Sequence, residues 1–289
     1  MNGAARFWVV CLVLLSLAGC SSNRFAYRNA DWFINWALDD YVELNREQQR
    51  QFDRALDEFL GWHCSVEMPR YGIYLRDVSA ALAPDAPVTL DAGTLQELSV
   101  RALQFWELLL SKALDESLPV LQGLDDEQVQ QMLDEFAEKN RDFYKEYVSV
   151  DEKKLVKLRV ERVRDAMRRW AGSISKQQIQ LAQVWAQDAD NVYGLIYERR
   201  ERWREQFAAL MKQRTGESFL VELTDLLLHP GRFYSAAERE RLLANQRSAQ
   251  QLLLALEQSL IEKQRARMLA ELAKITEDIS RLSEPGCGK

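Results

Sequence analysis

The sequence predicts an all-α protein, a multi-helix bundle of about nine or ten helices. Prolines and glycines are sparse, 6 and 12 in 289 residues, and no proline lies between Pro119 and Pro230. The chain is rich in Leu, Ala, Glu, Gln and Arg, which favour helices. No stretch alternates apolar and polar residues with β-branched enrichment, as a strand would. These three observations together predict helices throughout.

One helix-start pattern recurs along the chain. An apolar residue is followed by a capping residue, and Gln or Glu stands three positions after the cap, as in a capping box. The clear cases lie at residues 44–48, 124–128, 174–178 and 234–238, and residues 260–264 form a version without a good cap. The spacings, roughly 80, 50, 60 and 26 residues, are irregular, which indicates a repeated helix-start device and not a solenoid.

The apolar spacing and the helix-stop signals then place the individual helices. We expect them at 31–38, 67–83, 91–118, 151–172, 175–214, 217–229, 236–258 and 260–282, with two further helices that begin after the caps Asn45 and Asp125. Pro69 suits a first helical turn, while Pro119 and the Pro230-Gly231 pair should end helices. The stretch 175–214 should bend or break near 188–191, so it forms one helix or two.

The first of these helices, 31–38, is unusually aromatic. It contains Trp32, Phe33 and Trp36. Large aromatic side chains on a helix are typical of a domain core, and this is the location we expect. Contact with a membrane is the alternative.

Composition and charge limit the classes of partner. The formal charge is −6, and it becomes −7 if Arg6 is removed with an N-terminal signal (37 Lys and Arg against 44 Asp and Glu). A mildly acidic chain is a poor candidate for binding nucleic acid. We expect no cofactor, because the sequence lacks a phosphate-cradling glycine loop and a Gly-x-Ser-x-Gly turn.

The N-terminus carries the pattern of an export signal. A 12-residue apolar run, residues 7–18, is broken only by Ser16 and ends at Leu17-Ala18-Gly19-Cys20. The run is shorter than the ~20 residues of a membrane-spanning helix. These residues resemble the lipobox of bacterial lipoproteins. The resemblance implies that residues 1–19 are a cleaved signal peptide and that Cys20 receives acyl chains such as palmitate.

The residues after Cys20 predict the destination of the protein. Ser21 and Ser22 follow, without the Asp that retains such lipoproteins in the inner membrane of Gram-negative bacteria. The resemblance therefore implies an anchor in the outer membrane, with the protein facing the periplasm. We expect residues 20–29 to form a lipid-anchored tether, 30–283 a helical domain and 284–289 a C-terminal tail.

Several short motifs resemble a family of proteobacterial lipoproteins, domain of unknown function 6279 (DUF6279). The matching residues are 27–32, 39–44, Gln48, Trp62-His63, Pro69-Arg70-Tyr71 and Leu75. The likeness continues through the helix starts and Arg202-Trp203. Cys64 departs from it, since a polar or basic residue is expected there. The resemblance implies a helical fold in the cell envelope and no defined activity.

The helix starts are also similar to those of periplasmic helical chaperones of the Spy and CpxP type. Those proteins carry a Leu-Thr-x-x-Gln motif, matched here at 44–48, 124–128 and 174–178 without Thr at the cap. A capping box alone produces this pattern in any helical bundle.

Four cysteines become three if the signal is removed. Cys20 would carry lipid, which leaves Cys64 and Cys287 as a pair in an oxidising compartment. We expect a disulfide between them. The alternative is a buried free Cys64 and a C-terminal Cys287 without a partner.

Candidate catalytic residues are few. His63 and His229 are the only histidines, and no metal-binding spacing occurs, so we expect no metal. His63 stands at the end of a helix, where it suits the negative end of the helix dipole. Glu116-Ser117 and Glu217-Ser218 offer the Glu-Ser pair of lytic transglycosylases without the Gly-Leu-Met-Gln stretch that follows it in that family.

A basic stretch runs from Lys153 to Arg169. With arginines further on, it forms a candidate binding face for anionic headgroups or acidic clients, comprising Arg159, Arg162, Arg169, Arg199 and Arg202. A solvated surface of i,i+4 ion pairs is the plainer interpretation.

The sequence thus predicts a non-enzymatic, lipid-anchored protein. Its partners would be the membrane, through Cys20, and protein clients or envelope components, through a helical surface. The alternatives are a cell-wall hydrolase and a purely structural envelope tether.

Overall fold

The computed structural model describes residues 22–84 and 90–283, and these are helical apart from short connections. They contain no strand, so the all-α prediction is confirmed for the described part of the chain. The α-helices are α2 (Ser22–Arg28), α3 (Ala30–Asp39), α4 (Arg46–Trp62), α5 (Met68–Leu82), α6 (Ala92–Gln122), α7 (Asp126–Phe143), α8 (Glu152–Ala171), α9 (Lys176–Asp188), α10 (Tyr193–Met211), α11 (Phe219–Leu228), α12 (Ala236–Gln258) and α13 (Glu262–Leu282). Two π-helical turns, η1 (His63–Glu67) and η2 (Tyr144–Val148), and one 3₁₀ turn, η3 (Pro230–Phe233), complete them.

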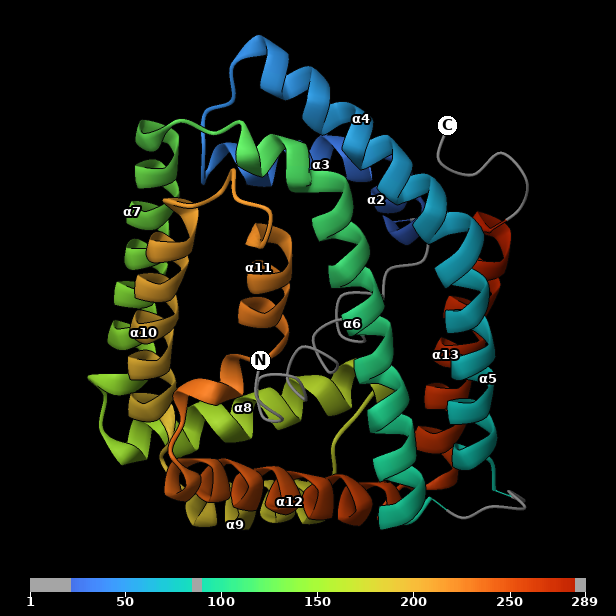
Figure 1. The fold of residues 1–289 in the computed structure, drawn as a ribbon. Coiled ribbons are helices and arrows are strands. Elements are labelled where there is room, and N and C mark those ends of the chain that lie inside the picture. The colour runs from blue at the N-terminus through green and yellow to red at the C-terminus, as the bar shows by residue number, and fades with distance from the viewer. Residues whose placement is uncertain (1–21, 85–89, 284–289) are drawn as a thin grey trace.

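The helices are arranged around the sides of a frame (Figure 1). Helices α7 and α10 pair along one side, and α5 and α13 pair along the opposite side. Helices α9 and α12 lie together across one end, and α4 packs on α6 towards the other. Helix α11 lies inside the frame, between α10 and α6.

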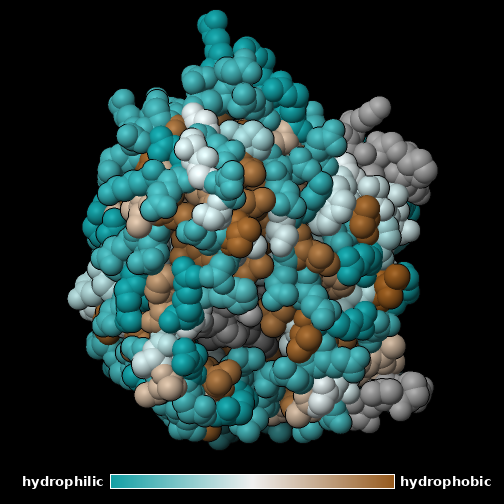
Figure 2. Space-filling view, viewed as in Figure 1, coloured by the Kyte–Doolittle hydropathy of each residue, from teal (hydrophilic) through white to brown (hydrophobic). Residues whose placement is uncertain are grey.

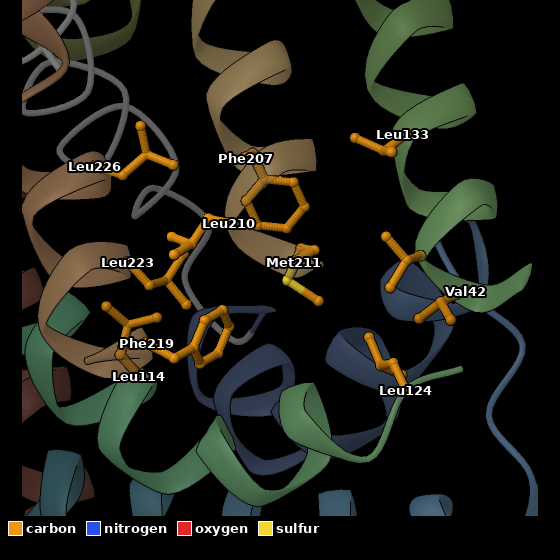
Figure 3. Close-up of a cluster of buried hydrophobic side chains, with 11 residues drawn as sticks. Val42, Leu114, Leu124, Leu133, Phe207, Leu210, Met211, Phe219, Leu223 and Leu226 are labelled. Atoms are coloured by element: carbon orange, nitrogen blue, oxygen red, sulfur yellow. The ribbon is translucent and has the colours of Figure 1, made fainter. Parts of the chain in front are cut away.

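The apolar core follows the frame as four clusters. The largest joins α6, α7, α10 and α11, and Phe207, Met211, Phe219 and Leu223 are among its most deeply buried side chains (Figure 3). A second cluster joins η1, α5, α6 and α13. Two smaller clusters hold α8 with α12, and the start of α10 with the start of α12. Each side of the frame is therefore stabilised by its own buried contacts.

The recurring helix starts come together in two pairs. Gln48 and Gln128 each donate a hydrogen bond to the other's side-chain oxygen, at 2.8 and 2.7 Å, and Gln178 and Gln264 do the same at 2.9 and 3.0 Å. Each glutamine also donates to a backbone carbonyl next to the partner's helix, as Gln48 does to Gly123 at 2.8 Å. All four side chains are buried. The capping residues thus join helix starts that lie far apart in the sequence.

Several predicted helix boundaries are confirmed. Helix α12 spans the predicted residues, and Ser235 and Glu238 form its capping box. The stretch 175–214 divides into α9 and α10 on either side of 189–192. Gly172 ends α8 with φ of 75°, a left-handed conformation that glycine adopts without steric cost.

Two boundary predictions were wrong. Helix α6 continues through Pro119 to Gln122, because a proline one turn from the helix end removes only one backbone hydrogen bond. Figure 1 shows that the C-terminal end of α6 bends away from the direction of the rest of the helix. Residues 22–28, expected in a tether, form α2.

The expected core position of the helix at 31–38 was also wrong. Trp32 and Trp36 on α3 are each 60% exposed, and α3 has no fully buried residue. The aromatic side chains therefore face outward.

Candidate functional site: a buried cluster beneath the N-terminal helices

Large or ionisable side chains recur at every fourth position through the first π-helical turn and form a stripe along it. They are Phe59, His63, Glu67 and Tyr71. In an α-helix, four residues rotate about 40° more than one turn, so such a stripe drifts around the helix. The wider turn η1, in which Met68 N–H donates to the carbonyl of His63, counteracts this drift and keeps the stripe on one side.

The wider turn also accommodates Pro69. A proline in a regular helix clashes with the carbonyl four residues earlier, here that of Ser65. Residues 46–82 therefore continue through α4, η1 and α5 without a break. π-Helical turns occur frequently at functional sites, which draws attention to η1.

The His63 ring is enclosed by aromatic neighbours. It stacks on Phe59 with ring centroids 6.0 Å apart, and Tyr71 and Tyr27 lie 5.5 and 5.7 Å away. The Tyr27 hydroxyl is 2.9 Å from His63 Nδ1. This burial lowers the pKa of His63 from 6.5 to about 4, so the ring is neutral at neutral pH.

Glu67 lies next along the stripe. Its side chain is fully buried, and Oε1 accepts a hydrogen bond from Arg70 Nη1 at 2.7 Å. Oε2 has no hydrogen-bond partner within the described residues. Burial and the nearby Glu67 charge together raise the pKa of Tyr71 well above its ordinary value. Burial likewise raises the pKa of Tyr27 to about 12.

The cluster is suited to holding a helix in place. A histidine with a pKa near 4 is neutral at neutral pH, so it carries no imidazolium proton for acid catalysis and is a weak base. Tyr27 is the contact from α2, and a second contact from Gln49 to Asn35, at 2.6 Å, joins α4 to α3. We name Tyr27, Phe59, His63, Glu67, Arg70 and Tyr71 the docking cluster.

The arginines of the predicted binding face are dispersed. Arg159 is buried and donates to Glu152 and to the carbonyl of Ala186, at 2.9 and 2.8 Å. Arg162 lies over the Tyr147 ring at 4.9 Å and donates to its hydroxyl. Both are near the second π-helical turn, whereas Arg169 is half-buried towards the other end of α8, about 15 Å along the helix from Arg159.

The two arginines on α10 face the 3₁₀ turn. Arg199 hydrogen-bonds to Tyr234, and burial lowers its pKa below the usual value. Arg202 donates to the carbonyl of Phe233 at 2.7 Å. Four of the five predicted arginines, all except Arg169, therefore bind parts of the chain itself, and the structure does not gather the five on one exposed face.

The two Glu-Ser pairs lie in different surroundings. Glu116 on α6 is held in an ion pair with Lys112, and Glu217 lies on an exposed turn before α11. Neither has the enclosed apolar surroundings of a carboxyl general acid. Among the described residues, no group of three His, Cys, Asp or Glu side chains could hold a metal ion.

Cys64 lies in η1 beside the docking cluster and is completely buried. Its sulfur takes part in a disulfide and lies 2.9 Å from the carbonyl oxygen of Leu282, at the end of α13. Cys287 and Cys20 lie outside the described residues, so the pairing and the lipid attachment stay predictions. No helix in the described part of the chain has both the length and the apolar character needed to cross a membrane.

Sequence reasoning placed His63 only at the end of a helix and did not assign Tyr27, Glu67 or Tyr71 a role. The four-residue repeat of the stripe was the available signal. Tyr27 could not be found this way, because it comes from another helix.

Comparison with known protein families gives a match over most of the chain. The model of a family of unknown function, DUF6279, matches residues 40–239. This range includes all of the docking cluster except Tyr27. No curated protein and no solved structure matches the chain.

Proposed function

Given that this chain belongs to the DUF6279 family, whose description states no function, we propose that it is a lipoprotein anchored in the outer membrane by Cys20. Its helical domain would face the periplasm and bind a protein or another envelope component without catalysing a reaction. The lipobox at 17–20 and the absence of Asp after Cys20 support this location.

The observation that carries the proposal is the attachment of α2. This helix begins at Ser22, two residues after Cys20, and Tyr27 fixes it to the docking cluster. A lipid on Cys20 would therefore connect to the folded domain with almost no intervening chain. The domain would be held against the membrane surface, and its binding surfaces would keep a defined height above the lipid.

Exposed apolar side chains on the frame support a binding role. Val100 and Leu108 on α6, Val221 on α11 and Leu243 on α12 are each about 40% exposed or more. Figure 2 shows hydrophobic side chains gathered towards the middle of one face. Such surfaces suit extended or partly unfolded protein clients. The helix-start likeness to Spy-type chaperones adds little, because the glutamines here have a structural role.

Metabolic labelling tests the anchor. Cells that express the wild-type chain with labelled palmitate should yield a labelled protein in the outer-membrane fraction, and Cys20→Ser should abolish the label. Cys64→Ser, which leaves the lipobox intact, is the matched control and should remain labelled. A wild-type protein without label would contradict the proposal.

In-cell crosslinking of the labelled protein would then identify its neighbour. The competing hydrolase hypothesis would require peptidoglycan clearing in a zymogram that Glu116→Gln or Glu217→Gln abolishes.

A further inference from the structure

An aromatic surface covers the outward side of α2 and α3. Its members are Phe25, Trp32, Phe33 and Trp36, with 64%, 60%, 40% and 60% of their surfaces exposed. We name these four residues the aromatic face. Isolated exposed apolar residues are common, but four large aromatic side chains along 12 residues are a concentrated patch.

The aromatic face lies on the side of α2 and α3 that points away from the rest of the domain. Backbone hydrogen bonds from Asn29 to Phe25 and from Phe33 to Asn29, both 3.1 Å, continue the helical pattern across the turn between them. At about 100° per residue, Phe25, Trp32 and Trp36 fall within one narrow sector.

The inward side is apolar as well. Tyr27, Ile34 and Leu38 lie about 160° around the helix from the aromatic face. Tyr27 contacts His63, and Leu38 packs on the largest core cluster. The helices thus have two apolar sides, of which the domain covers one.

The chemistry of the aromatic face fits the interfacial layer of a lipid bilayer. Tryptophan and phenylalanine partition into this layer, and an amphipathic helix there lies parallel to the surface. Helices α2 and α3 together extend about 27 Å, which is long enough for such contact. Residues 22–45 contain two arginines, Arg24 and Arg28, against four acidic residues, Asp31, Asp39, Asp40 and Glu43, which gives the segment a net charge of −2. Attraction to anionic headgroups is therefore not the driving force.

The position of Cys20 selects the membrane over another occupant. Cys20 lies five residues before Phe25, so an acyl chain on it would enter the leaflet beside the aromatic face. We propose that Phe25, Trp32, Phe33 and Trp36 insert into the headgroup region of the leaflet that holds the lipid anchor. This inference rests on the proposed function, and it adds a second attachment that sets the orientation of the domain.

Quenching by brominated lipid tests this insertion. The processed, acylated chain is purified from membranes and reconstituted into phosphatidylcholine vesicles, with or without bromine on the acyl chains. Trp8 is lost with residues 1–19, so Trp32 and Trp36 are two of the seven tryptophans in the processed chain (eight minus one), and brominated lipid should remove roughly a quarter of the emission. The Trp32→Phe/Trp36→Phe variant keeps the face aromatic and should lose this quenching.

Trp203→Phe is the matched control. Trp203 packs against the largest core cluster, so its removal should leave the amount of emission lost to brominated lipid unchanged. Equal quenching of the wild type and the Trp32→Phe/Trp36→Phe variant would overturn the insertion. Crosslinks between copies through residues 25–36, with no quenching, would overturn it in favour of a dimer.

Flotation separates this result from a failure of the proposed function. A chain without lipid would not float with the vesicles, which contradicts the anchor. A chain that floats but is not quenched keeps the anchor and contradicts the inserted face.

Discussion

His63 shows how burial changes the chemistry of a single side chain. Its ring has aromatic neighbours on several sides, and desolvation lowers its pKa to about 4. Protonation would place a charge between Tyr27, Phe59 and Tyr71, so the folded state resists it. The contact between α2 and the domain therefore depends on a neutral histidine.

This predicts a loss of stability in acid. The pKa of His63 is lower in the folded state than in the unfolded chain, so the unfolded state binds more protons between about pH 6.5 and pH 4. Stability is fully present above pH 6.5 and falls as the pH is lowered through this window. Between pH 7 and pH 5 the loss from His63 should be about 2 kcal/mol in urea unfolding.

His63→Gln should remove this part of the pH dependence, since glutamine does not titrate. His229 is exposed and pairs with Asp225, so His229→Gln is the control and should keep the dependence of the wild type. An unchanged pH dependence in His63→Gln would show that other groups cause it.

The Glu67–Arg70 pair gives a second prediction at the residue scale. Glu67 is fully buried, so Arg70→Met would leave its carboxylate without a positive partner. Because the Arg70 side chain is 46% exposed, we expect a cost of about 2 kcal/mol, below that of a fully buried pair. Arg50 pairs with Glu47 at the same spacing on the surface, and Arg50→Met should cost less than about 0.5 kcal/mol in the same urea assay. Equal costs would indicate that Glu67 is not charged.

At the scale of the element, the buried glutamines at the helix starts have two structural roles. Gln178 accepts a hydrogen bond from the backbone N–H of Ser175 and donates to Gln264 and Ser259. The same side chain therefore caps its own helix and joins it to α13. Gln264 completes the pair although Ile261, at its cap position, has no side-chain acceptor.

Gln178→Ala should therefore cost more than a typical cap. The change removes one hydrogen-bond partner each from the buried Gln264 amide and the half-buried Ser259, and it also removes the cap of the Ser175 backbone N–H, so we expect a loss of about 2–4 kcal/mol. The exposed neighbour Gln177→Ala should change stability by no more than about 0.5 kcal/mol. Thermal or urea unfolding measures both, and similar values would contradict a role for the pair.

The elements also show what sequence reasoning could reach. Capping residues and prolines act locally, which is why the starts of α4, α7, α9 and α12 were predictable. The pairing of the glutamines depends on contacts between helices about 80 residues apart, and no local signal contains it. Tyr27 in the docking cluster was missed for the same reason.

The aromatic face shows most directly what the sequence alone does not predict. Hydrophobicity predicts burial only when some apolar surface is available to cover the side chain. The inner side of α3 already supplies that contact through Leu38, and Trp32 and Trp36 remain outside. Composition alone cannot state which of two apolar sides meets the domain.

At the scale of the whole molecule, contacts must join the sides of the frame to one another. The α4–α5 segment and α13 form one side, and Cys64 touches the end of α13 through the carbonyl of Leu282. A disulfide from Cys64 to Cys287 would close a loop of 223 residues (287 minus 64). In the chain-entropy model such a loop stabilises the folded state by up to about 5 kcal/mol.

Reduction should therefore lower the unfolding temperature of the processed protein. The Cys64→Ala/Cys287→Ala variant should be insensitive to the reductant, whereas the wild type should lose several degrees. A thiol assay on the denatured, non-reduced protein should count no free thiol. A count of two would contradict the disulfide.

The paired glutamines carry a consequence for the order of folding. The first pair joins residues 48 and 128, and the second joins 178 and 264, so the two loops follow one another without overlapping. If the chain is exported from its N-terminus, as proposed, the first loop could close before residue 178 reaches the periplasm. A disulfide between Cys64 and Cys287 would need nearly the whole chain and would form last. Folding during translocation would then proceed in two successive steps, followed by oxidation.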